Sequence, residues 1–163
     1  MLRAIKGDIT KQSGVGVICN AANGTGPMGA GVAGAIRRAG GRAIQAEAEA
    51  CCAARDIQPG ELYVTGAGTL PYERIVHLVT MKKPGGTTSY PIVRSCLHAL
   101  VRYCEEAGVW AVALPALGTG VGRLDPQRVA ELFGEVLRPH PTIDFIAVDI
   151  DEAFINYVLQ EAG

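Results

Sequence analysis

Short apolar runs alternate with segments of helical periodicity along the whole chain of 163 residues. The apolar runs have the length and the content of buried strands. They cover 2–6, 15–19, 62–65, 74–80, 110–114 and 144–148. Helices are expected between them and at the end of the chain, over 31–40, 42–55, 93–104, 126–137 and 152–161. Strands that alternate with helices predict a layered α/β domain with a mostly parallel sheet.

The composition is that of one ordinary globular domain spanning residues 1–163. Apolar residues make up 48%, charged residues 19%, and the formal net charge is -1. This near-neutral charge argues against a nucleic-acid partner. The few basic pairs are also not interleaved with the aromatic residues that single-strand binding would use. No apolar stretch is long enough to span a membrane, and the first residues lack the apolar core of a signal peptide. We therefore expect a cytoplasmic protein with no membrane contact.

The five cysteines indicate reduced, buried thiols rather than a disulfide framework. Their number is odd and no Cys-x-x-Cys occurs, so neither a zinc site nor another metal site is predicted. Of the three histidines, His77 lies inside an apolar run and is expected to be a hydrogen-bonded structural residue. His98 and His140 are expected to be exposed.

Two glycine-rich turns each follow an apolar run and lead into a helical pattern. The first spans Gly29–Gly34 and the second spans Pro115–Gly122. Glycine allows backbone N–H groups to approach an anion closely, and the dipole of a helix favours negative charge at its N-terminus. Together the two turns predict a cradle for a diphosphate.

Read literally, the first turn is a G-x-G-x-x-G string, so an NAD-binding oxidoreductase is an alternative. That motif needs its first glycine at the strand end and an acidic residue about 20 positions further on. Here nine residues separate Cys19 from Gly29, and the nearest acidic candidate, Asp56, lies between a helix and a turn. A Walker phosphate loop and a Gly-x-Ser-x-Gly elbow are both missing from the sequence. The NAD-binding oxidoreductase is therefore kept only as a remote alternative.

Four strings in order carry a resemblance to a known family. They are Gly-Asp-Ile-Thr at 7–10, Asn-Ala-Ala-Asn at 20–23, Gly-Val-Ala-Gly-Ala-Ile at 31–36 and Pro-Ala-Leu-Gly-Thr-Gly at 115–120. With them the sequence resembles the macro domain family over essentially its whole length. The resemblance implies a three-layer α/β/α fold with a six-stranded mixed, mostly parallel sheet. It also implies a ligand, ADP-ribose or an ADP-ribosylated protein, that lies across the strand ends, and no further cofactor.

The resemblance also implies a role for each site residue. Asp8 would accept a hydrogen bond from the exocyclic amine of adenine, with the Ile9 backbone alongside. Asn23 would bind the distal ribose and is the candidate catalytic residue, while Asn20 would hold the loop. The diphosphate would contact the first turn through Gly29, Ala30, Gly31 and Val32 and the second through Gly118, Thr119, Gly120, Val121 and Gly122. A turn or cap role for Asp8 and Asn23 is the structural alternative.

Three departures from the family pattern bear on catalysis. Hydrolases of the MacroD type have an aspartate where this chain has Ala33, and an aromatic residue where it has Gly122. Many members also place an aromatic ring against adenine just after the last strand, where this chain has Asp149 and Ile150. Binding of ADP-ribose is therefore favoured as the main role. The alternative is a mono-ADP-ribosyl hydrolase or an O-acetyl-ADP-ribose deacetylase, in which a bound phosphate acts as the base.

Overall fold

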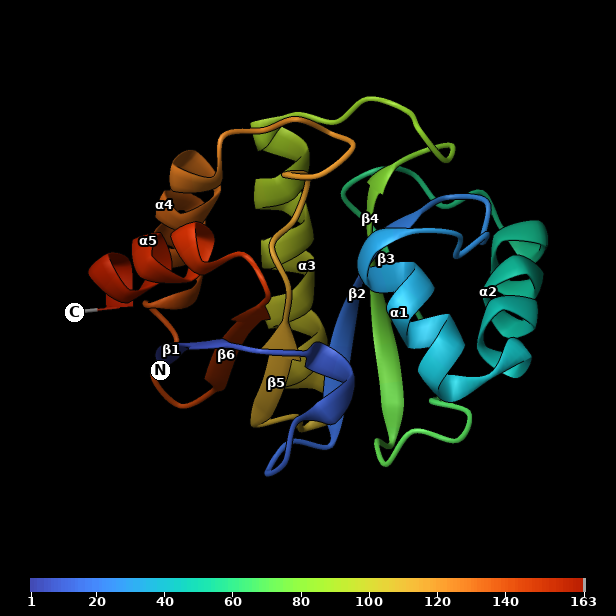
Figure 1. Cartoon of the computed structure of the whole chain (residues 1–163), viewed down its shortest axis with the longest axis horizontal. Helices are drawn as coiled ribbons and strands as arrows, with labels where there is room; N and C mark the ends of the chain where they lie inside the picture. The colour runs from blue at the N-terminus through green and yellow to red at the C-terminus, as the bar shows by residue number, and fades with distance from the viewer. Residues whose placement is uncertain (163) are drawn as a thin grey trace.

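A computed structural model describes residues 1–162 as a central sheet between two layers of helices (Figure 1). The sheet has six strands in the order β1-β6-β5-β2-β4-β3. Every neighbouring pair is parallel except β3 with β4, so the sheet is mixed and mostly parallel, as expected. The strands are β1 (Leu2–Lys6), β2 (Val17–Asn23), β3 (Leu62–Thr65), β4 (Arg74–Met81), β5 (Ala111–Leu114) and β6 (Asp144–Asp149).

Helices cover both faces of the sheet, which gives the expected three layers. One face packs against α1 (Gly31–Gly40) and α2 (Arg42–Ala54). The other packs against α3 (Tyr90–Ala107), α4 (Pro126–Leu137) and α5 (Glu152–Ala162) (Figure 1). A short 3-10 turn, η1 (Ile9–Lys11), follows β1. Because successive strand side chains point to opposite faces, each face contributes to its own apolar core.

Local signals account for the helix boundaries. Asp125 caps α4 by accepting a hydrogen bond from the Gln127 N–H at 2.9 Å, and Pro126 occupies the first turn. Gly41 takes a φ of 94° and separates α1 from α2. A residue with a side chain rarely adopts this φ, which explains why the predicted break at the glycine pair occurs.

The expectations for β2, Trp110 and two cysteines are wrong in detail, and His140, expected to be exposed, is half-buried. β2 begins at Val17 and continues to Asn23, because β4 supplies backbone partners along that whole length. Trp110 precedes β5 and is 58% exposed, so it belongs to the turn before the strand. Cys51 and Cys52 are half-buried on α2 rather than part of the core, whereas the other three cysteines are buried. All five cysteines are free thiols in this structure.

A buried polar network crosses the sheet at His77, which is a structural residue as predicted. Nδ1 of His77 lies 3.1 Å from Asn20 Nδ2, and Nε2 lies 2.9 Å from Thr65 Oγ1. The ring stacks on Tyr63 at 4.5 Å between centroids. These contacts fit a neutral imidazole that accepts from Asn20 and donates to Thr65. Burial lowers the pKa of His77 to about 3, because charging the ring inside the core is costly.

This buried imidazole predicts a pH-dependent stability. The unfolded chain takes up a proton at His77 near pH 6.5, whereas the folded chain does so only near pH 3. The contribution of His77 to the free energy of unfolding should therefore be fully present above pH 6.5. Below that pH it should fall by at most about 1.4 kcal/mol per pH unit. Urea unfolding between pH 6.5 and 4.5 should show this slope in the wild type and lose it in His77→Gln. His98→Gln, which changes an exposed imidazole, should keep the wild-type slope; an unchanged slope in both variants would contradict the assignment.

Candidate functional site

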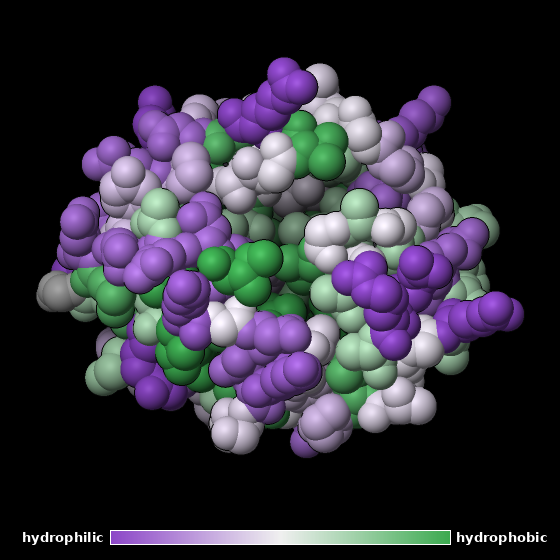
Figure 2. Space-filling view, viewed as in Figure 1, coloured by the Kyte–Doolittle hydropathy of each residue, from purple (hydrophilic) through white to green (hydrophobic). Residues whose placement is uncertain are grey.

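The residues predicted to form the site gather at one edge of the sheet. β1, β2, β5 and β6 are mutually parallel, so their carboxyl ends meet there, where ligands of open α/β sheets bind. The loops after β2, β4 and β5 run along this edge in the upper part of Figure 1. Figure 2 shows the same side of the molecule, with a hollow near the middle of the face and apolar side chains beside it.

The first glycine turn presents the open N-terminus of α1. Gly31 begins the helix with a φ of 60°, and Ala30 before it provides no side-chain cap. A Cβ built on Gly29 or Gly31 would meet nothing within 4 Å, so open space lies in front of both residues. Val32 and Ala33 are half-buried against the core on the α1 and α2 side. The free N–H groups and the helix dipole make this turn suited to an anion.

The second glycine turn folds back on itself after β5. Gly118 has a φ of 73°, and its carbonyl accepts from the Leu124 N–H at 2.9 Å. The Gly120 carbonyl accepts from the Arg123 N–H at 3.0 Å. A Cβ on Gly120 would meet nothing within 4 Å, and Val121 is 63% exposed. The tip of this turn is therefore open as well.

Gly122 stands where the family pattern described above has an aromatic residue, and the packing around it leaves no room for a side chain. A Cβ built there would lie 2.5 Å from Thr88 Cγ2 and 2.6 Å from the Gly118 carbonyl oxygen. Thr88 belongs to the loop after β4, so this loop closes over the second turn. An aromatic side chain cannot enter without moving the loop.

Asp149 was not predicted as a site residue, and it ties the second turn to the end of β6. Its Oδ2 accepts from the Ala116 N–H at 3.0 Å, and its Oδ1 accepts from the Asp151 N–H at 2.9 Å. An acidic residue directly after a buried strand was the only available signal. Its partner is 33 residues away in the chain, and no local pattern indicates that contact.

Asp8 lies at the carboxyl end of β1 and caps η1. Its Oδ1 accepts from the Thr10 N–H at 2.9 Å and from the Thr10 hydroxyl at 2.7 Å. These hydrogen bonds favour the charged carboxylate and lower the pKa of Asp8. The cap uses only Oδ1, so Oδ2 is available to a ligand. The Ile9 side chain is buried, which leaves its backbone as the part that a ligand can meet.

Asn23 ends β2 and holds the turn that follows. Its Oδ1 accepts from the Thr25 N–H at 3.0 Å and from the Gly26 N–H at 2.8 Å. Its Nδ2 donates to the Pro27 carbonyl at 2.9 Å. An amide nitrogen has two hydrogens, so one remains for another acceptor. Asn20 was expected to hold the loop, and this is wrong: it lies within β2 and is buried against His77, because β2 continues to Asn23.

The end of β6 lies beside Asp8. The Gly7 N–H donates to the Asp149 carbonyl at 3.0 Å, which joins the two strand ends. Ile150 follows directly and is 78% exposed. This end of the site therefore offers an exposed aliphatic side chain at the strand end that adjoins Gly7 and Asp8.

Comparison with known proteins shows that the chain belongs to the macro domain family. The Macro domain model matches residues 19–133. A protein of Aquifex aeolicus is 34% identical, with 95% of this chain and 93% of that protein aligned. The macro domain-containing protein in the non 5'region of Streptomyces griseus is also 34% identical, over 96% of this chain and 92% of its own.

Solved structures confirm the predicted fold. The macrodomain of Thermus aquaticus DarG is 28% identical with a TM-score of 0.80, covering 91% of this chain and 97% of its own. The Oceanobacillus iheyensis macrodomain with ADP is 22% identical with a TM-score of 0.84, covering 98% of this chain and 88% of its own. A mutant of that macrodomain has been solved with ADPR.

The described residues contain neither a metal-binding cluster nor a helix that could span a membrane. Within residues 1–162, no group of three or more His, Cys, Asp or Glu side chains is arranged to hold a metal ion. Over the same residues, no helix combines the length and apolar character needed to cross a membrane.

The two glycines of the second turn make a matched test of its packing. Gly122→Ala should lower the free energy of unfolding by about 1–3 kcal/mol, because the added methyl overlaps Thr88 and the Gly118 carbonyl. Gly120→Ala adds the same methyl into open space and should stay close to the wild type. Urea unfolding of both variants provides the comparison. Equal losses in the two would show that the turn is not packed in this way.

Proposed function

We propose that the protein binds ADP-ribose, free or attached to a protein, across the carboxyl edge of the sheet. The observation that carries the proposal is the pair of open glycine turns at this edge. Gly29 and Gly31 in the first turn and Gly120 in the second all face empty space, while both turns present backbone N–H groups. Membership of the macro domain family and the relatives solved with ADP and ADPR support the same ligand.

The diphosphate would be held mainly by backbone dipoles. One phosphate would accept hydrogen bonds from the N–H groups of Gly31 and Val32 at the N-terminus of α1. The other would lie within the second turn, over Gly118 to Val121. Hydrogen bonds to a charged group contribute about 1.5–3 kcal/mol each, and a helix N-terminus adds about 0.3–1 kcal/mol. Several such contacts would hold the diphosphate without a lysine or arginine side chain in either turn.

Adenine would lie at the β1 and β6 ends. The free Oδ2 of Asp8 would accept from the exocyclic amine, which is a charge-assisted hydrogen bond because the carboxyl stays ionised. Ile150, exposed beside it, would cover the base by aliphatic contact. The apolar contact of Ile150 would stabilise the base less than stacking on an aromatic ring does.

The distal ribose would lie over the first turn, where Asn23 could donate its remaining Nδ2 hydrogen to a hydroxyl. Catalysis has less support than binding. Ala33 packs against the core and offers no carboxylate, and no side chain in the turns is a clear general base. If the protein is a mono-ADP-ribosyl hydrolase or an O-acetyl-ADP-ribose deacetylase, the base would be the bound phosphate and Asn23 would position the ribose.

The binding proposal predicts one ADP-ribose site by titration calorimetry. Asp8→Asn should weaken binding at least about tenfold, since it removes the charge and places an amide beside the amine of adenine. It should hardly change the melting temperature, because asparagine caps a turn about as well as aspartate. Asp144→Asn, the same change at the opposite end of β6, is the control and should bind normally.

A base-swapped ligand isolates the Asp8 contact. IDP has a carbonyl in place of the adenine amine, so the wild type should bind ADP more tightly than IDP. Asp8→Asn should lose this preference. An absence of heat with ADP-ribose would refute the proposed function. An ADP preference that Asp8→Asn retains would refute only the role of Asp8.

Hydrolysis is tested separately from binding. The substrates are a protein mono-ADP-ribosylated on aspartate or glutamate and, in a second arm, O-acetyl-ADP-ribose. We expect the wild type to release product no faster than Asn23→Ala, because the cleft lacks a protein base. Asn156→Ala, an exposed change on α5, is the matched control. Release by the wild type and Asn156→Ala that exceeds Asn23→Ala would instead establish the enzyme. Melting temperatures of the variants exclude misfolding as the cause.

A further inference from the structure

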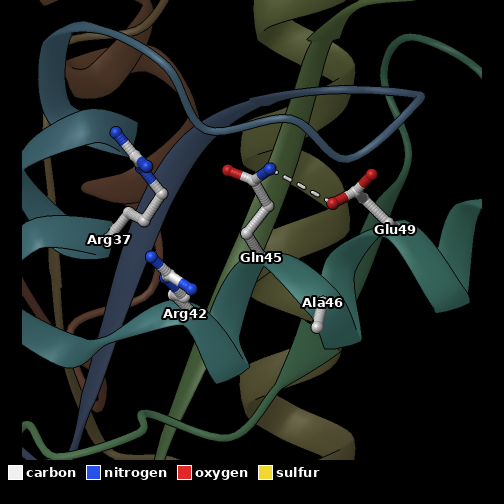
Figure 3. A pocket seen from close by; sticks show the side chains of 5 residues that line it. All are labelled: Arg37, Arg42, Gln45, Ala46 and Glu49. Atoms are coloured by element: carbon white, nitrogen blue, oxygen red, sulfur yellow. Dashed lines mark hydrogen bonds between the residues drawn. The ribbon is translucent and has the colours of Figure 1, made fainter.

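A second concave site lies between α1 and α2 (Figure 3). The groove has a volume of about 320 Å³. Arg37 lines it from α1, and Arg42, Gln45, Ala46 and Glu49 line it from α2. The α2 residues follow a spacing of three, four and seven, which places them on one face of that helix. Arg37 is six residues beyond Gly31, about 9 Å along the α1 axis from the turn proposed to bind diphosphate.

The two arginines of this groove have no carboxylate partner. Among residues 1–162, neither Arg37 nor Arg42 takes part in an ion pair. The Nε atom of Arg37 is also shielded from water and has no hydrogen-bond acceptor within the described chain. Figure 3 shows the two side chains rising from their helices on the same side of the groove. The groove therefore holds two guanidinium groups that have no anionic partner among residues 1–162, and Arg42 is exposed to solvent.

The other polar side chains in the groove are already engaged. Gln45 Oε1 accepts from the Met28 N–H at 3.0 Å, and Gln45 Nε2 donates to Glu49 Oε1 at 3.1 Å. The loop before α1 is held tightly here, since a Cβ on Gly26 would lie 2.6 Å from Glu49 Cα. Two arginines and one glutamate give the lining a net charge of +1. The first turn of α2 has no acidic residue or side-chain cap of its own. The end of α1 meets it at Gly41, so the dipoles of the two helices offset each other here and the arginines supply the positive charge.

We infer that this groove is a second, separate site that binds a phosphate group. Two guanidinium groups offer more N–H donors than the two oxygens of a carboxylate can accept, whereas a phosphate has three terminal oxygens and a charge of about -1.5 to -2. Arginine also matches phosphate by paired, parallel hydrogen bonds. The site goes beyond the proposed ADP-ribose cleft and does not depend on it, because the two share no lining residue.

Solution NMR on the whole chain tests the inference. The protein is labelled with ¹⁵N and saturated with ADP-ribose, so that the cleft is filled. Inorganic phosphate and O-phosphoserine are then titrated in separate arms at constant ionic strength. We expect saturable shifts at the Arg37 and Arg42 Nε–H signals and at backbone amides over 42–49. A response to phosphate alone identifies free phosphate as the ligand, and a response to O-phosphoserine alone identifies a phosphate ester.

Variants separate binding from general charge effects. The double variant Arg37→Gln and Arg42→Gln should weaken the response at least tenfold. Arg37→Lys with Arg42→Lys keeps the charge but loses the paired hydrogen bonds, so it should bind with intermediate strength. Arg102→Gln, an exposed change on α3, is the control and should bind as the wild type does.

Three results would overturn the inference. The first is no saturable shift with either probe, and the second is shifts in the double glutamine variant that equal those of the wild type. The third is a lower melting temperature of that variant with unchanged phosphate binding. The last would mean that the arginines only stabilise the ends of the two helices. If ADP-ribose itself does not bind, phosphate shifts over 29–32 and 118–122 would report the cleft and shifts over 42–49 the groove. The two proposals can therefore fail separately.

Discussion

The parallel pairing of β2 with β4 is the constraint on which the rest of the site depends. The pairing runs from Val17 beside Arg74 to Asn23 beside Met81, with a register shift at its last residue. Both strands are covered on both faces, so this pairing is fixed by burial as well as by backbone hydrogen bonds. A hydrogen bond between the side chains of Asn20 and His77 also links these two strands. Because β2 ends at Asn23, the pairing fixes the strand end from which the chain continues to the first glycine turn at Gly29.

The two glycine turns are held in place by side chains outside them. Gln45 on α2 accepts from Met28 in the loop that leads to the first turn, and Asp149 at the end of β6 accepts from Ala116 at the start of the second. Thr88 packs over Gly118 and Gly122 from a third loop. Glycine would otherwise leave these turns with a large conformational entropy. The anchors order the backbone before a ligand arrives, which reduces the cost of binding.

Much of this arrangement follows from local patterns in the sequence. The helices, five of the six strands within a residue or so, and the cap at Asp125 reflect interactions between neighbouring residues, which a sequence displays directly. The glycine turns are recognisable for the same reason. Gln45 and Asp149 are different, because their partners lie 17 and 33 residues away and neither residue type is unusual where it stands. Thr88 likewise looks like any loop threonine until the fold brings it against Gly122. The length of β2 was missed because pairing with β4, not local preference, extends it to Asn23.

The two proposed anion sites would hold negative charge by different physical means. The cleft would use backbone N–H groups and a helix N-terminus, which are oriented dipoles with no net charge, close to the ligand and fixed by the fold. The groove would use two guanidinium groups near the surface, where salt screens the interaction over a Debye length of about 8 Å. Ionic strength should accordingly weaken the groove much more than the cleft. Ala33 supplies no carboxylate and Gly122 has no side chain. Both residues fit binding by backbone dipoles, because such a cleft needs small residues that leave room for the ligand rather than a reactive side chain.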